Sequence, residues 1–443
     1  MARPDVIVVG AGCAGLSAAV RLASRGARVL VVEERRRLGG RATAFPDPVT
    51  GEPVDNGQHA LFGCYHETFA FLEAIGAAGE VRLDDRLDLE IVDRAGRRSR
   101  LSSVRGLPSP LHLVAGLLRW RALDMADRVA AVRLGQVLRR LGRAEQPAAD
   151  RDLERLTVDA WLNAERQTPR LSELLWEPLA IAALNQSPAV AAAGPFVAVL
   201  ARMFAGSRRD AAIGLPLKPL DALYAEPARR WLESRGHAVR TGEPARLVVE
   251  NGRAAGVEVK GERLASGAVI SSVPWFAFSA FAGDVPALAA IEANAAAMAS
   301  SPIVTVNLWL DRAVTDGPLV GLPGRTFQWV FDKARLLGEQ ASHLSLVSSG
   351  AEAVVGMSNE ALAELARSEL AAALPAARGA AVLRSTAVRE KRATFSLAPG
   401  QPARPAPRTP VDRLFLAGDW TDTGLPATIE GAVASGHLAA ALP

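Results

Sequence analysis

The sequence is poor in cysteine, tyrosine and lysine. Its two cysteines, Cys13 and Cys64, are too few for a disulfide framework, so we expect a reducing, cytoplasmic compartment. Nearly all positive charge comes from arginine, because lysine occurs only at Lys218, Lys260, Lys333 and Lys391. The pI near 9.5 does not by itself indicate a partner. No basic face interleaved with aromatic residues is evident, and we expect no nucleic acid partner.

Long hydrophobic runs and clustered metal ligands are also missing. The longest apolar stretch, about residues 189–204, is interrupted by Gly194, Pro195 and Arg202 and does not predict a transmembrane helix. The first strand starts almost at the N-terminus, which leaves no room for a signal peptide. Histidine and cysteine never gather at metal-ligand spacing, so we predict no metal. With 49% hydrophobic residues in a chain of 443, we expect two or three lobes around a substantial core.

The first informative motif is glycine-rich and follows a short apolar strand. Residues 5–9 form a β-branched run that is typical of a parallel strand buried on both faces. Gly10, Gly12 and Gly15 follow at the G-x-G-x-x-G spacing, which permits a tight turn, close approach to a pyrophosphate and close helix packing. Residues 16–23 repeat apolar side chains at helical spacing. The free N–H groups at the start of that helix favour a bound phosphate.

An acidic residue ends the second predicted strand. Residues 29–33 form another apolar run, and Glu33 stands where a carboxylate accepts hydrogen bonds from both hydroxyls of an adenosine ribose. The same charge disfavours a 2′-phosphate, so NADP is not expected at this site. Strand, glycines, helix, strand and acid in register predict a dinucleotide site in an α/β fold. We interpret Cys13, inside the glycine loop, as a packing residue rather than a redox group.

The loop after Glu33 narrows the cofactor. Residues 39–41 (Gly-Gly-Arg) form a second phosphate-side motif, which a flavin's second phosphate and ribityl chain need and a nicotinamide does not. Residues 35–37, all arginine, are interpreted as a solvated charge run. Near the other end of the chain, residues 414–420 (Leu-Phe-Leu-Ala-Gly-Asp-Trp) precede a helical pattern at 428–436. These two ends share a site only if the whole chain folds around it.

Together these motifs resemble the flavin-containing amine oxidase and phytoene desaturase superfamily, which has a glutathione-reductase-type FAD fold. Residues 39–41 match its second phosphate motif, and residues 55–59 (Asp-Asn-Gly-Gln-His) match the stretch beside the isoalloxazine. Gly418 and Asp419 match the motif whose acid contacts the ribityl–phosphate region. Residues 428–436 match a closing helix whose N-terminus points at the flavin pyrimidine, where a helix dipole stabilises the negative charge of reduced flavin.

The resemblance implies FAD as the cofactor and a set of residues that bind it. Leu247 enters this set because such flavoproteins return to the FAD fold at the position of residues 246–249, where the backbone touches the adenine. The full set predicted to bind FAD is Gly10, Gly12, Cys13, Ala14, Gly15, Glu33, Glu34, Gly39, Gly40, Arg41, Gly57, Gln58, His59, Leu247, Gly418, Asp419, Ala427, Thr428 and Ile429.

The predicted fold class is α/β, with a glutathione-reductase-type (Rossmann-like) FAD-binding domain and an inserted α+β substrate domain. We expect the FAD-binding domain to be discontinuous, because its motifs are widely separated. Its parts are predicted at residues 1–59, 221–274 and 396–443. The substrate domain is predicted at residues 60–220, which are rich in helix patterns, and at residues 275–395.

The substrate class follows from one absence and several longer matches. Amine oxidases of this superfamily carry an aromatic residue just before the closing Glu-Gly-Ala, whereas this chain has residues 427–429 (Ala-Thr-Ile) there. An amine substrate is therefore disfavoured. Four longer strings resemble the squalene-associated flavoproteins of hopanoid-making bacteria, the hydroxysqualene dehydroxylases; they are residues 176–188, 214–220, 327–332 and 417–428. The resemblance implies a lipid substrate, hydroxysqualene or a related isoprenoid, whose hydroxyl is removed to give squalene.

Such a reaction needs a proton donor. An allylic alcohol loses water once its oxygen is protonated, and reduced flavin can then deliver hydride. The candidate donors are Glu177, Asp210 and His59, with Asn185 and Gln186 as anchors for the hydroxyl. Each donor has a structural alternative: Glu177 caps a helix, Asp210 pairs with a neighbouring arginine (Arg208 or Arg209), and His59 lines the flavin.

Two other functions stay open on the sequence alone. A carotenoid-type desaturase has the same fold and moves hydride in the opposite direction. A non-catalytic, FAD-bound, membrane-associated protein would leave a complete cofactor site unused. No second dinucleotide fingerprint is present, so the electron donor is unidentified.

Residues 107–141 raise the question of membrane contact. They contain many leucines and Trp120 beside several arginines, namely Arg119, Arg121, Arg128 and Arg133. A basic, apolar, Trp-bearing stretch fits the bilayer interface. It fits equally well an amphipathic helix whose apolar side lies in the core. We therefore expect a cytoplasmic protein that is either free or peripheral on the inner face of the membrane.

Overall fold

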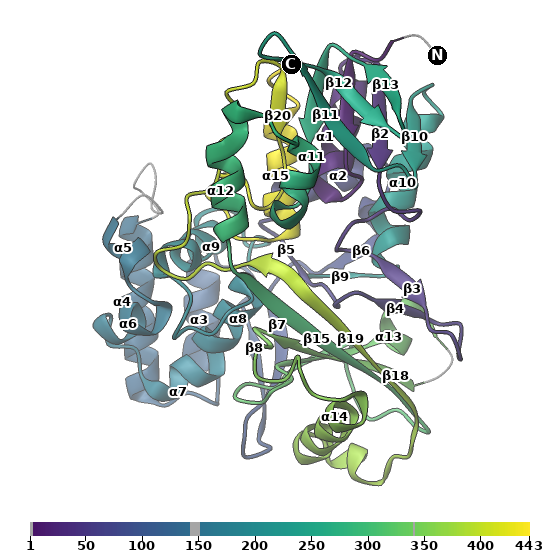
Figure 1. Ribbon diagram of the computed structural model, residues 1–443. Coiled ribbons are helices and arrows are strands. Elements are labelled where there is room, and N and C mark those ends of the chain that lie inside the picture. The colour runs from purple at the N-terminus through teal and green to yellow at the C-terminus, as the bar shows by residue number, and fades with distance from the viewer. Residues whose placement is uncertain (1–2, 142–150, 340–341) are drawn as a thin grey trace.

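The computed structural model describes residues 3–141, 151–339 and 342–443. The half that lies uppermost in Figure 1 is built on a parallel sheet with the strand order β10-β2-β1-β14-β20. Its strands are β1 (Val6–Val9), β2 (Val29–Glu33), β10 (Ala238–Thr241), β14 (Ala268–Ser271) and β20 (Leu414–Leu416). They come from three separated parts of the chain, so this sheet forms only when both ends have met.

The parallel sheet is covered on both faces, which explains its unbroken apolar strands. Alternate side chains of β1 (Val6 and Val8) pack with helix α1, while Ile7 and Val9 belong to the core on the opposite face. The helices on the first face are α1 (Cys13–Ser24), α15 (Ile429–Ala439) and α10 (Glu226–Glu233). The opposite core includes the strands β11 (Ala245–Glu250) and β12 (Arg253–Val259). These two strands pair with each other, and β12 also pairs with β13 (Glu262–Ala265).

The turn between β11 and β12 follows directly from its two residues. Asn251 and Gly252 have φ angles of 50° and 77°. Positive φ at both central positions is what an Asn-Gly hairpin turn requires, and its twist matches that of the paired strands. The dipeptide therefore sets this hairpin.

A seven-stranded sheet, in the order β19-β15-β18-β17-β16-β7-β8, forms the other half. Its strands are β7 (Asp88–Val92), β8 (Arg98–Ser102), β15 (Ser300–Leu310), β16 (Leu319–Gly321), β17 (Trp329–Asp332), β18 (Ser342–Ser349) and β19 (Val382–Phe395). Helix α14 (Asn359–Ala373) covers the outer face, where Val304, Val306 and Leu308 of β15 join its core. The intervening residues of β15, beginning with Ile303, therefore lie on the inner face.

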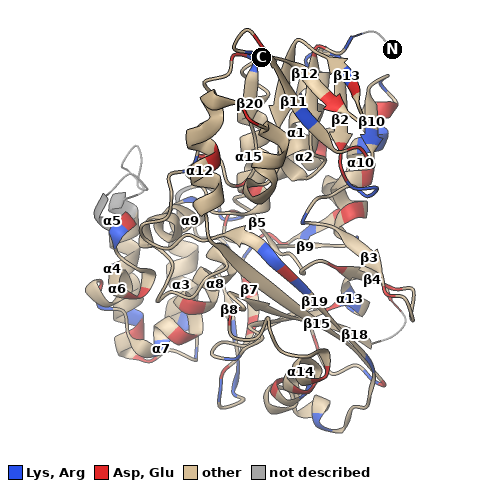
Figure 2. Ribbon diagram, in the orientation of Figure 1, with Lys and Arg blue, Asp and Glu red and all other residues tan. Residues whose placement is uncertain are grey.

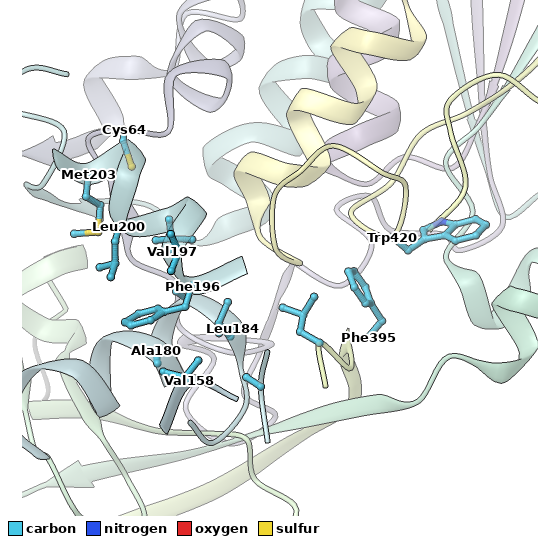
Figure 3. Packing of buried hydrophobic residues seen from close by; sticks show 14 of the residues in the cluster. Cys64, Val158, Ala180, Leu184, Phe196, Val197, Leu200, Met203, Phe395 and Trp420 are labelled. Atoms are coloured by element: carbon cyan, nitrogen blue, oxygen red, sulfur yellow. The ribbon is translucent and has the colours of Figure 1, made fainter. Parts of the chain in front are cut away.

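A bundle of short helices stands beside that sheet (Figure 1). Its members are α3 (Leu111–Arg119), α4 (Met125–Leu141), α5 (Arg151–Arg155), α6 (Val158–Ala164), α7 (Pro169–Leu171), α8 (Glu177–Leu184) and α9 (Ala193–Ala205). Figure 3 shows Phe196, Val197 and Leu200 of α9 beside Ala180 and Leu184 of α8 in the buried cluster. Among the described residues no helix is both long enough and apolar enough to cross a bilayer.

Small elements connect these parts. They are β3 (Ala44–Pro46), β4 (Pro53–Asp55), β5 (Leu61–Phe62), β6 (Val81–Leu83), β9 (Ile213–Pro216), α2 (His66–Ala74), α11 (Phe278–Ala282), α12 (Ala289–Ala297) and α13 (Lys333–Leu337). Helix α2 packs against α15, and α11 packs against β11. Both helices thus contact the parallel-sheet half, although the predicted boundaries at residues 59 and 274 assign them to the substrate part. Their short apolar patterns do not reveal which sheet they cover.

Candidate functional site

Two glycine loops lie against each other at the carboxyl ends of β1 and β2. A Cβ on Gly40 would lie 3.3 Å from the Cα of Gly12, so the two backbones approach as closely as glycine allows. Gly10 has a φ of 101°, which side chains rarely adopt, and supports the tight turn into α1. Gly12 is the N-cap of α1 and brings no capping side chain. The helix start is therefore open to a phosphate.

Glu33 is buried at the end of β2 and holds the first loop in place. Its Oε2 accepts a hydrogen bond from the backbone N–H of Ala11 at 2.7 Å, and its Oε1 accepts one from the N–H of Arg35 at 2.9 Å. The carboxylate thus lies beside the glycine loop, as its predicted ribose role requires. Glu34, also predicted to bind FAD, is exposed.

The two ends of the chain meet in an ion pair between Arg41 and Asp419. Nη2 of Arg41 lies 2.5 Å from Oδ1 of Asp419, across 378 residues of sequence. Arg41 also donates to the carbonyl oxygen of Ala393 at 2.7 Å and lies over the ring of Trp275. Burial disfavours the charge of Arg41, but the Asp419 carboxylate outweighs burial and raises the pKa of the guanidinium. The pair therefore fixes a positive group beside the glycine loops.

Helix α15 begins where the resemblance predicts. Thr428 is its N-cap, and its hydroxyl accepts a hydrogen bond from the N–H of Gly431 at 3.0 Å. Ala427 and Ile429 flank this cap, and the buried hydroxyl of Ser435 accepts from the N–H of Gly418 at 2.7 Å. The middle of α15 and the loop that carries Asp419 are thus held together. A positive dipole end is set near the cofactor motifs.

Glu430, the second residue of α15, has a different role from its neighbours. Its buried carboxylate accepts hydrogen bonds from the N–H groups of Glu67 and Thr68, at 3.1 and 2.9 Å, and from the Thr68 hydroxyl at 2.7 Å. These are donors of the first turn of α2. Glu430 therefore caps α2 and anchors it to α15.

The segment at residues 55–59 connects the cofactor half with the seven-stranded sheet. A Cβ on Gly57 would lie 3.8 Å from Cγ2 of Ile303 on the inner face of β15. His59 has its Nδ1 2.7 Å from the carbonyl oxygen of Gly57. Burial lowers the pKa of His59 below its ordinary value, although the Asp55 carboxylate acts in the opposite direction. His59 is therefore neutral at pH 7 and has a fixed ring orientation.

Tyr224 supports the second glycine loop, and two predicted FAD-binding residues, Cys13 and Leu247, lie on α1 and β11. The buried hydroxyl of Tyr224 lies 2.7 Å from the carbonyl oxygens of both Gly39 and Ala42, a contact that no local motif signals. Burial raises the pKa of the Cys13 thiol to about 11, which favours the packing role predicted for it. Leu247 lies on β11 and is half-buried.

One of the three predicted proton donors, Asp210, lies in a structural network. Asp210 is buried; its Oδ2 accepts from the N–H of Ser207, and its Oδ1 lies 2.8 Å from the Ser207 hydroxyl and 3.2 Å from Nε2 of His66. It therefore closes a turn and meets His66, whereas the sequence alternative paired it with Arg208 or Arg209. Glu177 begins α8, and burial raises its pKa.

The predicted hydroxyl anchors are committed to the protein itself. The amide of Asn185 donates both of its N–H groups, to the carbonyl oxygen of Ser301 at 3.1 Å and to Thr394 Oγ1 at 3.0 Å. The amide of Gln186 donates to Ser396 Oγ at 2.9 Å and accepts from the N–H of Leu397 at 2.6 Å. These contacts tie the end of α8 to β15 and β19. The expectation that Asn185 holds a substrate hydroxyl is wrong, because its donors are already used.

The inner face of the seven-stranded sheet carries polar atoms that sequence reasoning missed. The buried atoms Thr305 Oγ1 and Trp329 Nε1 have no hydrogen-bond partner among the described residues. Thr305 pairs with Val347, and Val347 pairs with Trp329, so the two lie in one row across three strands. The row is two residues along β15 from Ile303, which lies beside Gly57. Gln58 Oε1 is buried and unpartnered in the same way.

A possible metal-ligand cluster lies at the far end of this sheet. Glu52, Glu339 and His343 bring ligand atoms within 4.8 Å of one another. The contacts within the group account for it without an ion. His343 Nδ1 lies 2.8 Å from Glu339 Oε2, and the indole of Trp309 donates to Glu52. Glu52 is far from the other two in sequence, so the group of three leaves no spacing signal, and the absence of a metal stays a prediction.

Charge is dispersed over the molecule. Figure 2 shows basic and acidic segments interspersed on both halves, with a mixed stretch on β19. Within that stretch Glu390 accepts from the amide of Asn56 at 2.8 Å, next to the 55–59 segment.

The residues present fit a flavin dinucleotide. Two touching glycine loops, an uncapped helix start, a carboxylate at the end of β2 and an arginine fixed by Asp419 supply backbone N–H groups and charge at one edge of the parallel sheet. Ligands of such sheets bind at the carboxyl ends of the strands. The sequence motifs and the geometry therefore designate the same edge.

Comparison with known proteins places the chain in a family. The profile of the family described as flavin-containing amine oxidoreductase matches residues 13–442. The hydroxysqualene dehydroxylase of Rhodopseudomonas palustris is 31% identical over 99% of this chain and 97% of its own length. The zeta-carotene desaturase of Solanum lycopersicum is 25% identical over 98% of this chain and 80% of its own. A solved oxidoreductase from Methanosarcina mazei, 18% identical, superposes with a TM-score of 0.75 over 97% of this chain and 98% of its own.

These findings confirm the predicted fold class, the superfamily resemblance and FAD as cofactor. The relatives with isoprenoid substrates match nearly the whole chain, as the strings in the middle of the sequence predict. The chain belongs to the flavin-containing amine oxidoreductase family and is an FAD-dependent oxidoreductase.

Proposed function

We propose that the enzyme removes the hydroxyl of hydroxysqualene and releases squalene. The observation that carries this proposal is the 31% identity, over nearly the full length of both chains, with a hydroxysqualene dehydroxylase. A second relative of that name, from Sinorhizobium fredii, is 29% identical over 99% of this chain. The missing aromatic residue before Glu430 supports a non-amine substrate, and so does the apolar helical region.

The chemistry divides between the cofactor and the protein. Bound in reduced form, FAD supplies hydride to a carbon that has lost its hydroxyl as water. The protein binds the isoprenoid chain, keeps water away, and holds the hydroxyl where a proton reaches it. One alcohol, one proton and one hydride give one hydrocarbon and one water, so the atoms and charges balance. An electron donor, still unidentified, must reduce the flavin between turnovers.

We propose that His59 takes part in the proton delivery. It is the one predicted donor that lies in the segment beside the expected isoalloxazine position, next to Gly57 and Ile303. Because burial lowers the pKa of His59, its imidazole is neutral at rest. In this role it relays a proton from solvent to the substrate hydroxyl and does not hold that proton beforehand. Asp210 lies in another network, which supports a structural role for it, and Glu177 lies at the start of α8.

We also propose that Thr305 and Trp329 receive the substrate hydroxyl. Both offer a buried, unpartnered hydrogen-bonding atom on the sheet face that carries Ile303. An unsatisfied buried polar group is costly, and a ligand hydroxyl relieves that cost. This assignment takes the place of Asn185 and Gln186 in the sequence-based hypothesis.

A carotenoid-type desaturase is the second candidate, and the tomato desaturase relative favours it. The two reactions use the same stacked flavin and differ in the direction of hydride transfer. We rank it second because two dehydroxylase relatives, at 31% and 29% identity, are more similar to this chain than the desaturase of Solanum lycopersicum, at 25%. A non-catalytic FAD protein is the third candidate, and the complete cofactor site disfavours it.

The deciding experiment supplies each substrate under each redox condition. Purified enzyme is incubated anaerobically with chemically reduced FAD and hydroxysqualene, and the extracted lipids are analysed. We expect squalene. In a parallel incubation with oxidised FAD and squalene or a polyene, new double bonds would favour the desaturase. No lipid product in either incubation, from enzyme that retains FAD, would favour the non-catalytic alternative.

We further propose that the enzyme meets the membrane that dissolves its substrate, and that residues 107–141 make this contact. The helices α3 and α4 in this region expose apolar and basic side chains together. A peripheral contact of this kind needs no membrane-spanning helix.

A further inference from the structure

A surface hollow of about 680 Å³ lies where the hairpin of β7 and β8 meets the turn between α3 and α4. The hairpin and the helical region are in direct contact here, because α3 packs against β8. Six arginines line the hollow: Arg97, Arg98, Arg100, Arg119, Arg121 and Arg170. This concentration of guanidinium groups lies outside the cofactor site.

The hollow has an excess of positive charge. Only two carboxylates, Glu90 and Asp93, belong to its lining, against six arginines. Arg97 pairs with Asp93 at 2.8 Å, and Arg98 pairs with Glu90 at 3.5 Å, so these acids are already engaged. Arg100 and Arg170 face the carboxylates of Asp88 and Asp127, which lie outside the lining, at 2.7 and 3.9 Å.

Arg119 and Arg121 differ from the other four arginines. Both are exposed, and neither makes an ion pair with any described residue. Arg119 ends α3, and Arg121 begins the turn that leads to α4. Guanidinium groups bind phosphate through two parallel N–H bonds, and two such groups at one hollow fit a phosphate better than a single ammonium does.

Exposed apolar side chains, here called the apolar stripe, lie on α3 and α4, the helices before and after the turn that carries Arg121. Leu111 and Leu118 of α3 are 54% and 44% exposed, and Met125 and Val129 of α4 are 69% and 46% exposed. The spacings of seven and four residues place each pair on one side of its helix. The two helices contact each other, and Leu118 and Met125 stand on either side of the turn that carries Arg121. The sequence of this region fits either a helix packed on the core or a helix that faces the bilayer. The structure contains features of both, because Leu113 and Trp120 belong to the core while these four side chains face solvent.

We infer that this surface docks on a bilayer that contains anionic phospholipid. The stripe enters the interface, and the arginine hollow receives a headgroup phosphate. A free phosphate would need the arginines but not the stripe, whereas a lipid presents phosphate and acyl chain side by side. The inference rests on the proposed membrane contact and is independent of the reaction assigned to the enzyme.

The test is co-sedimentation of the FAD-loaded enzyme with vesicles of equal parts phosphatidylcholine and phosphatidylglycerol. We expect the wild type to bind them and to bind pure phosphatidylcholine vesicles weakly. The variant Arg119→Gln/Arg121→Gln should lose about 25-fold in partition coefficient, since each basic side chain near an anionic surface contributes about fivefold. The matched control Arg82→Gln/Arg253→Gln removes two exposed arginines elsewhere and should change partitioning little.

Two further measurements keep the inference falsifiable. Leu118→Ser/Met125→Ser should weaken binding to both vesicle types, because it removes the apolar half of the surface. Inorganic diphosphate added to the vesicles should compete only weakly; strong competition would point to a free phosphate ligand and overturn bilayer docking. Equal partitioning of the arginine variant and the wild type, or an equal loss in the control, would also overturn it.

The outcome is separable from that of the proposed reaction. Squalene formation from detergent-dispersed hydroxysqualene needs no bilayer, so the Arg119→Gln/Arg121→Gln variant should match the wild type there, with the same FAD content. Vesicle binding without squalene formation would leave the docking surface standing and remove the reaction. Squalene formation without any vesicle binding by the wild type would support the reaction and overturn the docking surface.

Discussion

Lys333 and Asp55 form an ion pair that is almost completely shielded from solvent. Nζ of Lys333 lies 2.5 Å from Oδ2 of Asp55, and their side chains are 0% and 3% exposed. Asp55 ends β4 and begins the segment beside the expected flavin ring, whereas Lys333 begins α13 on the seven-stranded sheet. The other carboxylate oxygen accepts from the N–H of Leu220 at 3.1 Å. One side chain thus fixes the flavin-facing segment to two other parts of the chain.

Lys333→Met is expected to destabilise the folded protein by about 3 kcal/mol, because it leaves a buried carboxylate without its counter-charge. The measurement is urea-induced unfolding at saturating FAD, followed by circular dichroism. Methionine retains most of the volume of lysine, so a packing defect should contribute little.

The double variant Lys333→Met/Asp55→Asn is the matched control for this pair. Asparagine keeps an acceptor for the N–H of Leu220 and removes the unpaired charge, so much of the lost stability should return. If the double variant were as unstable as Lys333→Met, the cost would come from packing and not from the orphaned charge.

Glu33→Ala is expected to weaken FAD binding by about 10- to 100-fold. The carboxylate holds the N–H of Ala11 in the first glycine loop and stands at the predicted ribose position, so two hydrogen bonds to a charged acceptor are at stake. The dissociation constant is measured by titrating the apoprotein with FAD and following flavin fluorescence. Glu34→Ala is the control, since Glu34 is exposed. A loss of affinity as large in Glu34→Ala would contradict the distinct role of Glu33.

The cofactor motifs were predictable because their geometry is local. Gly10 and Glu33 stand at fixed positions in one strand–helix–strand unit, and each residue type meets a requirement that its own neighbours impose. The pairing of Arg41 with Asp419 was anticipated only in outline, from two motifs that resemble one family. Its atomic contact depends on how the chain ends meet across 378 residues.

The substrate side could not be predicted in the same way. Asn185 is a polar residue in an apolar string, which suggests a ligand contact, yet its amide satisfies Ser301 and Thr394 across the fold. Conversely, Thr305 and Trp329 look like ordinary strand residues in sequence. Whether such a residue lacks a hydrogen-bond partner depends on the register of three strands. Strand register between distant segments leaves no local signal in the sequence.

Trp329→Phe and Thr305→Val are expected to lower dehydroxylation about 10-fold each without changing FAD affinity. Each removes one hydrogen-bonding atom. Valine has nearly the shape of threonine, so the loss in Thr305→Val reports recognition of the hydroxyl, whereas phenylalanine is smaller than tryptophan and needs the squalene measurement to separate shape from hydrogen bonding. The measurement is kcat/KM for hydroxysqualene together with the inhibition constant of squalene, which has no hydroxyl. Inhibition by squalene should stay unchanged.

Ser348→Ala provides the control for these two substitutions. Ser348 pairs with Val304 and so lies on the outer face of the same sheet, toward α14. It should leave both measurements unchanged. Equal losses for squalene and hydroxysqualene in Trp329→Phe would assign the tryptophan to shape and remove its role in hydroxyl recognition.

Arg384→Gln is expected to reduce stability at neutral pH, and this difference should vanish in acid. Burial alone would raise the pKa of Asp47, but two hydrogen bonds from Arg384, at 2.7 and 2.6 Å, and the N–H groups of Thr50 and Val49 lower it to about 2. A carboxyl with a depressed folded pKa stabilises the protein above its ordinary pKa of 3.8 and loses that contribution as the pH falls toward 2.

The gap between wild type and Arg384→Gln should therefore be constant from about pH 7 to about pH 4 and close below that. Urea unfolding at a series of pH values measures it. Arg312→Gln is the control, because Arg312 forms a similar two-pronged pair with Asp311 that is exposed and contributes little. A gap that persisted undiminished in acid would mean that Arg384 stabilises the fold through its packing over Trp309, and that its charge is not responsible.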